Sequence, residues 1–478
     1  MPELPDIQNE ANKTNKEIFN NVGKAFQEIS KFIGQINLEQ KAEKEKQQRE
    51  KAEAEKTNPT VTQKLSNNAS GFVFGTKNGG FITKSEDMDG HILVVGGVGS
   101  GKSSRIAIPT LKKWNSRVFA IDIKGELYEK TKPHKSNIKV FNPQDENSYG
   151  YDPYYLLRNS KNPAQEAEAI AQSIIPLPPD IKDPFWIESA QSILTGAILH
   201  YYKKEYSFID TLDEMQRKSP PDLIEIISES SNEKAQLYVN TFVGMEDKTL
   251  SSIFANLKSL RTLVTDDEIV SALSKPRENC ITPADLDKGY DVYINIPEYL
   301  LRQWKSLLTL MVNQFITFFE RREENNKTPI LFLLDEFPRL GKIPSILEAL
   351  ATLRSKKITI CPIIQSLAQL DVIYGEKERK VISDTCSYKA VLSATDADTQ
   401  EYFSKLVGTY EKSKTSSSMD HDPTLNMPSK SGTQTSTEEK RIIKPEEFAT
   451  LKDIVLFTPH GFFRVDKAPY YKQNNGGK

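Results

Sequence analysis

A glycine-rich loop that ends in lysine and serine is the first part of this chain that could do chemistry. The stretch "GGVGSGKSS" begins at Gly96, directly after the apolar run "HILVV". It fits the pattern G-x-x-x-x-G-K-[ST], whose backbone N–H groups surround phosphate oxygens. We expect a phosphate-binding loop made of Gly96, Gly97, Val98, Gly99, Ser100, Gly101, Lys102, Ser103 and Ser104.

Two side chains of this loop have expected roles of their own. Lys102 is a mobile point charge that can reach the β- and γ-phosphates, and the Ser103 hydroxyl can bind Mg²⁺. A helix that begins near Ser103 would add positive potential at its N-terminus. The ordinary alternative is a glycine-rich turn between a strand and a helix, but the loop follows an apolar strand as the nucleotide-binding motif requires.

A pair of carboxylates lies at the end of another apolar run, in "PILFLLDEFPRLGK" (329–342). A phosphate loop needs a second strand that ends in an acid, so Asp335 is expected to order Mg²⁺ through water. Glu336 can act as the general base on the attacking water. GTPase-type sites position that water with a glutamine, so Asp-Glu favours ATP. Without the loop, a surface carboxylate pair would be the simpler interpretation.

Two more polar residues follow the carboxylates. Gln365 ends the next predicted strand, "ITICPII", where it could touch both the γ-phosphate and the attacking water. Arg354 ends the intervening helix and could reach the ATP of a neighbouring subunit. The alternatives are a glutamine at a strand end and an exposed arginine near a helix C-terminus.

The elements that must position these residues are apolar strands separated by helices. The strands are near-continuously hydrophobic, as in a parallel sheet covered by helices on both faces. A stretch of about 150 residues between the third and fourth strands reads mostly as helix, which indicates an inserted all-helical domain. The predicted strands are 91–95, 117–123, 138–142, 291–296, 329–335, 358–364, 390–393 and 453–458.

Composition limits the remaining possibilities. The net charge of -2 excludes a generally basic nucleic-acid coat but permits a local basic channel, and "RSKK" (354–357) and "EKERK" (376–380) are the basic runs considered. Three widely spaced cysteines fit a reducing cytoplasm.

No apolar run approaches the ~18 residues of a membrane span, and the N-terminus carries no signal-peptide core. We therefore expect a cytoplasmic protein, peripheral at the inner face of the membrane at most.

The expected organisation has four parts. Residues 1–60 form a charged helical extension, with apolar residues from Phe19 to Ile36 on one side of a helix. Residues 61–183 and 287–478 form a nucleotide-binding domain, and 184–286 form the helical insertion. The stretch 411–440 is rich in Ser, Thr, Lys and Pro and predicts a mobile loop.

Together these segments resemble the coupling proteins of type IV secretion and conjugation, the TraG/TraD class of RecA-like ATPases related to the FtsK/HerA motors. The resemblance covers most of 71–410 and 441–472. Five segments carry it in order: "HILVVGGVGSGKSS", "FAIDIKGELYEKT" (119–131), "DPFWIESAQSILTGAIL" (183–199), "LLDEFPRLGKIPSILEALATLRSKKITICPIIQSLAQL" (333–370) and "IIKPEEFATLKDIVLF" (442–457).

The resemblance implies an α/β, RecA-like P-loop NTPase that assembles as a homohexamer and uses ATP and Mg²⁺. It implies that a relaxase–DNA complex is linked to a type IV secretion channel, with single-stranded DNA bound with little sequence preference. It also matches Arg354 to a subunit-bridging arginine and Gln365 to the sensor glutamine. Members of the class usually begin with transmembrane helices, whereas this chain offers only the Phe19–Ile36 stripe, which we expect to dock on a membrane-embedded partner.

Two other functions stay open at this point. The chain could be an ATP-dependent adaptor that recruits protein substrates to a type IV secretion system without pumping DNA. It could also be a chromosome or phage packaging motor of the same superfamily, although the "DPFW" helix and the long insertion argue against that.

Overall fold

The computed structural model describes residues 70–179, 181–324, 328–421 and 428–471, together with Leu65 and scattered helical residues between 30 and 49. The chain divides into two compact units. One comprises residues 1–56 and 404–444, and the other comprises 57–403 and 445–478. The second unit contains every residue for which chemistry is predicted.

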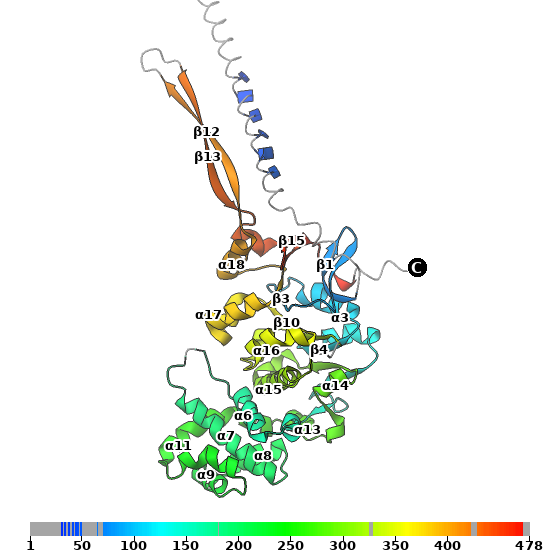
Figure 1. Ribbon diagram of the computed structural model, residues 1–478, viewed down its shortest axis with the longest axis vertical. Helices are drawn as coiled ribbons and strands as arrows, with labels where there is room; N and C mark the ends of the chain where they lie inside the picture. Colours follow the sequence, from blue (N-terminus) through cyan, green and yellow to red (C-terminus); the bar gives the residue numbers. More distant parts are fainter. Residues whose placement is uncertain are drawn as a thin grey trace, which may run out of the picture. The chain divides into compact units, whose positions relative to one another are not determined.

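The second unit is built on one mixed sheet (Figure 1). From β11 to β5 all neighbours run parallel, while β14 lies antiparallel to β11 and β15 antiparallel to β14. Within the described residues the sheet has nine strands, in the order β15 (Gly461–Val465), β14 (Ile454–Thr458), β11 (Tyr388–Val391), β3 (Ile92–Val95), β10 (Ile358–Ile364), β9 (Ile330–Leu334), β4 (Arg117–Asp122), β8 (Asp291–Asn295) and β5 (Ile138–Phe141).

All eight predicted strands are present, with ends that differ by at most two residues. Their continuous apolar runs follow from burial on both faces. On β9, Leu331 and Leu333 pack in a cluster with Leu111 of helix α3 (Ile108–Lys113). Phe332 faces the other way, and its ring centroid lies 5.8 Å from that of Phe319 of α15 (Leu301–Glu320). The predicted α/β fold with a mostly parallel sheet is confirmed.

A helical region lies between β5 and β8 and gathers at one end of this unit (Figure 1). It leaves and returns through two short parallel strands, β6 (Gly150–Tyr151) and β7 (Cys280–Ile281). Its helices are α5 (Tyr155–Asn159), α6 (Pro163–Ile174), α7 (Phe185–Lys203), α8 (Phe208–Arg217), α9 (Pro220–Ser228), α10 (Glu233–Val239), α11 (Asp247–Phe254), α12 (Leu260–Thr265) and α13 (Asp267–Leu273), with short 3-10 turns η3 (Asn240–Phe242) and η4 (Ala255–Ser259).

The predicted start of this insertion at residue 184 is too late. Helices α5 and α6 come earlier, and α6 packs against both α7 and α15. The Pro220-Pro221 pair does not merely interrupt the region. Ser219 caps the N-terminus of α9 by accepting from the Asp222 N–H, and the prolines occupy the first turn, where no N–H partner is needed.

The stretch 411–440 is not a loop in its described part. In the first unit, β12 (Thr409–His421) pairs antiparallel with β13 (Pro428–Arg441) to form a long hairpin. Composition suggested disorder, but Thr is favoured in strands and two such runs can satisfy each other's backbone groups. The N-terminal stripe falls mainly outside the described residues. Its described residue Ile33 is helical and exposed.

Three further features of the described residues complete the description. A hairpin of β1 (Gly71–Lys77) and β2 (Gly80–Ser85) precedes the phosphate loop and was not predicted. Cys280, Cys361 and Cys386 are all buried and free. Among the residues described in either unit, no helix is long and apolar enough to cross a membrane.

Candidate functional site

The strand order brings the predicted site residues to one edge of the sheet. The phosphate loop follows β3, Gln365 follows β10, and Asp335 and Glu336 follow β9. Since β10 lies between β3 and β9 and all three run parallel, their carboxyl ends are neighbours. Three segments that are far apart in the sequence thus meet with Gln365 in the middle.

The phosphate loop is held by its neighbours at two points. The Gly96 N–H donates to the carbonyl of Ile364 on β10 at 3.1 Å, and the Gly97 N–H donates to the Ser393 hydroxyl at 3.0 Å. The loop is therefore anchored to the strands on both sides, and Ser393 is a residue that the sequence reasoning missed. The signal that could have found it was its place as the polar last residue of the predicted strand 390–393.

The shape of the loop suits a group that carries negative charge. Gly99 and Gly101 have φ of +74° and +91°, a region that glycine enters without strain. A Cβ on Gly96 would lie 2.4 Å from Ser100 Oγ, so the close approach of the backbone requires glycine. Among the described residues, Ser100 Oγ is buried without a hydrogen-bond partner. A phosphate oxygen would satisfy such a group.

Lys102 lies inside the loop rather than on the surface. Its Nζ donates to the Gly96 carbonyl at 2.8 Å. Burial lowers the pKa of Lys102, and the nearby Glu336 and Asp335 carboxylates oppose that shift. The ammonium and both acids therefore share one electrostatic environment. Ser103 opens the turn η1 (Ser103–Ala107) that leads into α3, and Ser103 and Ser104 are partly exposed.

Asp335 is a buried carboxylate, with 8% of its surface exposed. Burial raises its pKa to about 6, and the neighbouring Glu336 carboxylate adds to that shift. Its Oδ1 accepts from the Glu336 N–H at 3.0 Å. Among the described residues no group of three His, Cys, Asp or Glu side chains could hold a metal. Mg²⁺ often uses only one or two protein ligands together with phosphates and water, so Asp335 and Ser103 fit such a site.

Glu336 and Gln365 form a direct pair. The Gln365 side-chain amide donates to both carboxylate oxygens of Glu336, at 3.0 and 3.2 Å. Glu336 has φ of +48°, a left-handed conformation that costs a non-glycine residue about 1 kcal/mol or more. Such strain is typical of positions where the direction of a side chain matters.

Arg354 is the one predicted residue that the fold keeps away from this group. It lies exposed in the 3-10 turn η8 (Leu353–Lys356), before β10 begins, whereas Gln365 follows the end of that strand. A strand of seven residues spans about 20 Å. Arg354 therefore lies at the opposite edge of the sheet from the phosphate loop of its own chain.

Asp122 is a further acid that the sequence reasoning did not single out. It ends β4, the strand beside β9, as Asp335 follows the end of β9. Burial raises its pKa to about 6, although its Oδ2 accepts from the Tyr128 N–H at 2.8 Å. The repeated pattern of an apolar strand ending in Asp was the signal that could have found it.

The tail after the carboxylates is fixed by its own contacts. Arg339 pairs with Glu298 at 2.6 Å, and Lys342 pairs with Glu378 of α17 (Leu367–Thr385) at 3.0 Å. Both cations are thus engaged at the surface. Lys342 thus ties the segment after β9 to the helix that follows Gln365, while Arg339 ties it to the turn η6 (Glu298–Leu300) that follows β8.

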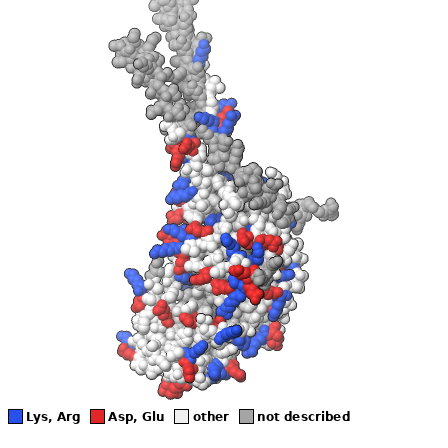
Figure 2. All heavy atoms as spheres, in the orientation of Figure 1, with Lys and Arg blue, Asp and Glu red and all other residues white. Residues whose placement is uncertain are grey.

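The two basic runs considered for DNA contact are largely paired. Lys357 lies 3.2 Å from Asp89, and Lys380 lies 2.7 Å from Glu376. Figure 2 shows basic and acidic residues interspersed over the visible face. Neither run therefore stands out as a DNA-binding surface.

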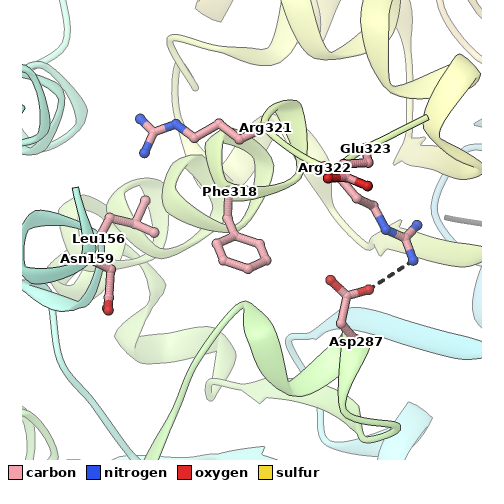
Figure 3. A pocket seen from close by; sticks show the side chains of 7 residues that line it. All are labelled: Leu156, Asn159, Asp287, Phe318, Arg321, Arg322 and Glu323. Atoms are coloured by element: carbon pink, nitrogen blue, oxygen red, sulfur yellow. Dashed lines mark hydrogen bonds and ion pairs between the residues drawn. The ribbon is translucent and has the colours of Figure 1, made fainter. Parts of the chain in front are cut away.

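A separate hollow of about 510 Å³ lies away from the site (Figure 3). Arg322 lines it, pairs with Asp287 at 2.9 Å and donates to the carbonyls of Thr328 and Lys356, which precede β9 and β10. Arg321 pairs with Glu166 at 2.5 Å. These charges tie together the amino ends of the strands, so the hollow is not part of the phosphate-loop site.

The sheet order, the anchored glycine loop and the acidic strand end define a RecA-like P-loop nucleotide-binding fold. The family described as "Type IV secretory system Conjugative DNA transfer" matches residues 17–477. The chain belongs to this family.

Individual relatives agree with that assignment. The chain is 26% identical over 411 residues to the protein VirD4 of Agrobacterium fabrum, a match that covers 82% of this chain and 60% of VirD4. It is 24% identical over 337 residues to the conjugal transfer protein TraG of Rhizobium radiobacter, covering 66% of this chain and 52% of TraG. The chain thus spans about half to three fifths of the length of these relatives.

Among solved structures, the bacterial conjugative coupling protein TrwBdeltaN70 has the same fold. The TM-score is 0.67 at 18% identity, and the alignment covers 86% of this chain and 91% of that one.

Proposed function

We propose that this chain hydrolyses ATP as a coupling protein, linking a relaxase–DNA complex to a type IV secretion channel and helping to drive DNA transfer. The observation that carries the proposal is the meeting of Glu336 and Gln365 beside Lys102, in a chain of the conjugative DNA-transfer family. A phosphate loop alone would support only nucleotide binding.

Each site residue then has a role. The loop from Gly96 to Ser104 binds the phosphates, and Lys102 turns from the Gly96 carbonyl to the β- and γ-phosphates. Glu336 accepts the proton of the attacking water as general base. Gln365 holds the Glu336 carboxylate and lies where it can sense the γ-phosphate.

The proposed nucleotide is ATP with Mg²⁺. Structures of TrwB contain the ATP analogue ADPNP in one case and ADP with Mg²⁺ in another. In this chain Ser103 and Asp335 would hold Mg²⁺, which supplies positive charge to the phosphates when bound. The buried Ser100 Oγ and the positive-φ glycines are the features of this chain that support the fit.

A homohexamer is part of the proposal. Arg354 is exposed at the sheet edge opposite the phosphate loop, so only a second subunit could bring it to the nucleotide. A ring in which each subunit contributes Arg354 to its neighbour's ATP accounts for both its exposure and its distance.

The substitution Glu336→Gln tests the proposed function. The variant should bind ATP but lose both hydrolysis and DNA transfer in a mating assay. Wild type should also show ATPase activity that single-stranded DNA stimulates. Transfer that persists with Glu336→Gln would refute a motor and favour the ATP-dependent adaptor for protein substrates. The family's description as a DNA-transfer family favours the motor.

The N-terminal stripe is proposed to dock on a membrane-embedded partner of the transfer machine. Its described residue Ile33 is 53% exposed, which leaves an apolar side chain available. Membrane fractionation with and without residues 1–60 tests this. If the truncated chain still sediments with membranes that contain the transfer partners, the docking hypothesis fails.

A further inference from the structure

A hollow of about 700 Å³ lies where the helical insertion joins the sheet. Its walls come from four places: the chain after β6, helix α5, the turn between α7 and α8, and the chain after α13. In the sheet, β5 leads into this region and lies five strand spacings from β3, about 24 Å. The hollow is therefore distinct from the phosphate-loop site.

Cationic side chains outnumber carboxylates in this hollow. Arg158, Lys203, Lys275 and Arg277 line it, against Asp152 and Glu205. The chain as a whole has a net charge of -2, so this local excess runs against the overall balance. Burial lowers the pKa of Arg158, and the nearby positive charge of Arg277 adds to that shift. Two guanidinium groups thus lie close enough to repel each other.

Two of the four cationic side chains that line the hollow, Arg158 and Lys275, are fixed by contacts with the protein. Arg158 forms an ion pair with Asp152, whose other oxygen accepts from the Tyr154 N–H at 2.9 Å. The Lys275 Nζ donates to the carbonyls of Glu146, at 2.8 Å, and Ser148. These contacts fix Arg158 and Lys275 in place, and of the two only Arg158 is paired with a carboxylate. A preorganised cation binds an anion with little loss of side-chain freedom.

The remaining cations have no such partners. Lys203 and Arg277 are exposed, and they make no ion pair or hydrogen bond with other described residues. They can therefore close over an anion that enters the hollow. Guanidinium groups match phosphate oxygens in pairs, which favours phosphate over a single point contact.

Aromatic rings form the other wall. Tyr154 packs edge-on against Tyr202 and Phe208, with centroid distances of 5.4 and 5.6 Å, and so fixes both rings. Tyr206 also lines the hollow, is 38% exposed and packs against Tyr201. An exposed ring beside cations is the combination that binds single-stranded nucleic acid, because a base stacks while its phosphate is neutralised.

We propose that this hollow binds one nucleotide unit, with its phosphate between Arg158, Arg277 and Lys203 and its base against Tyr206. This rests on the proposed function, because DNA is the ligand that the coupling activity would present. The unit comes either from a DNA strand or from a free mononucleotide. A strand held here lies at the joint between the helical insertion and the ATP-binding sheet.

The test is fluorescence anisotropy of a labelled 20-nucleotide oligo-dT with the full chain, without ATP, over a range of salt concentrations. The double variant Lys203→Ala/Arg277→Ala should bind about tenfold more weakly at low salt, with a salt slope smaller by about one to two. Tyr206→Ala should lose about fivefold or more, while Tyr206→Phe keeps the ring and should bind like wild type. Lys234→Ala removes an exposed lysine elsewhere in the insertion and is the matched control.

Basal ATPase activity and thermal unfolding should be unchanged in all these variants, which separates lost binding from lost folding. Competition by dTMP would identify a free mononucleotide as the source, and competition by unlabelled oligo-dT alone would identify a strand. The inference is overturned if the double variant binds like wild type at every salt concentration, or if polyglutamate competes as well as DNA. If the proposed function itself is wrong, wild type will show no DNA-stimulated ATPase activity.

Discussion

The side-chain amide of Gln365 donates to both carboxylate oxygens of Glu336, although 29 positions separate the two residues in the sequence. The contact exists because β10 lies between the strands that carry the phosphate loop and the acid. Under the proposed function, a γ-phosphate that contacts Gln365 would also alter the surroundings of Glu336, the proposed general base. The pair would then join nucleotide sensing to water activation.

Substitution of Gln365 by Ala should therefore lower kcat more than it changes nucleotide affinity. We expect a fall of about 100-fold in kcat, since the general base loses its orienting partner. Nucleotide affinity should stay within about twofold of wild type, because Gln365 is outside the phosphate loop. Steady-state ATPase kinetics and binding of a fluorescent ATP analogue measure the two quantities. Gln216→Ala, at an exposed position of α8, is the control, and equal losses in kcat and affinity would contradict this role.

Lys102→Ala should abolish nucleotide binding without unfolding the chain. In the proposed site the Lys102 ammonium neutralises the β- and γ-phosphates, so affinity for ATP should fall by about 100-fold or more. Isothermal titration measures the loss, and circular dichroism checks the fold. Lys130→Ala, an exposed lysine of α4 (Glu126–Thr131), should bind ATP normally. Unchanged ATP affinity in Lys102→Ala would rule out the loop as the binding site.

Gly101→Ala should weaken ATP binding, whereas the same substitution at Gly79, outside the phosphate loop, should not. At φ of +91° a Cβ is strained, and it would also lie 2.7 Å from the Arg105 side chain. Gly79, in the turn between β1 and β2, has φ of +81° and open space around it. Both substitutions should cost about 1 kcal/mol of unfolding free energy, but only Gly101→Ala should impair ATP binding. Equal ATP affinity in the two variants would contradict the proposed cradle.

The pKa of Asp335 predicts a pH dependence of stability. Burial raises that pKa from 3.8 to about 6, so the folded chain binds more protons than the unfolded chain between these values. The contribution of Asp335 to the free energy of unfolding is therefore fully present at low pH and is lost as the pH rises through about 6. Relative to Asp335→Asn, wild type should lose up to about 3 kcal/mol of unfolding free energy between pH 4 and pH 7. Urea unfolding of both proteins measures this, and parallel pH profiles would refute it.

Arg354 can be tested by mixing two inactive variants. Chains with Arg354→Ala keep the phosphate loop, and chains with Lys102→Ala keep Arg354. If the arginine acts on a neighbour's nucleotide, mixed rings should recover up to about a quarter of wild-type ATPase activity, because half of the intact loops face an intact arginine. Arginine action within one chain, or a purely structural role, predicts no recovery.

The sequence predicted the strands of the sheet well because each is buried on both faces, as with Leu331, Phe332 and Leu333 of β9. It also predicted that Asp335, Glu336 and Gln365 follow strand ends. It could not predict their contact, because strand order is a long-range property that no local pattern encodes. Finding β10 between β3 and β9 required the fold.

Other features could not be predicted because they depend on burial or on contacts between distant parts of the sequence. Asp122 stands out because burial raises its pKa, and a sequence pattern does not measure burial. Ser393 stands out because it accepts a hydrogen bond from the Gly97 N–H, which is distant in the sequence. The β12–β13 hairpin was misjudged because polar composition resembles disorder until a second matching run is paired with it. Arg354 was predicted to end a helix, and it lies exposed in the turn η8, but only the length of β10 placed it at the opposite edge of the sheet from the phosphate loop.

The strands β6 and β7 have a consequence for how such a protein can diversify. Gly150 is the register partner of Cys280, and Tyr151 of Ile281, so the helical region departs and rejoins at adjacent points. Neighbouring strands are about 4.8 Å apart, and because β6 and β7 run parallel the chain between them must form a crossover rather than a tight turn. The helical region is therefore connected in sequence to the sheet domain at one place, although α6 also packs against α15. Under the proposed function, changes in this region could alter which substrate the protein recognises while the edge that carries the phosphate loop keeps its geometry.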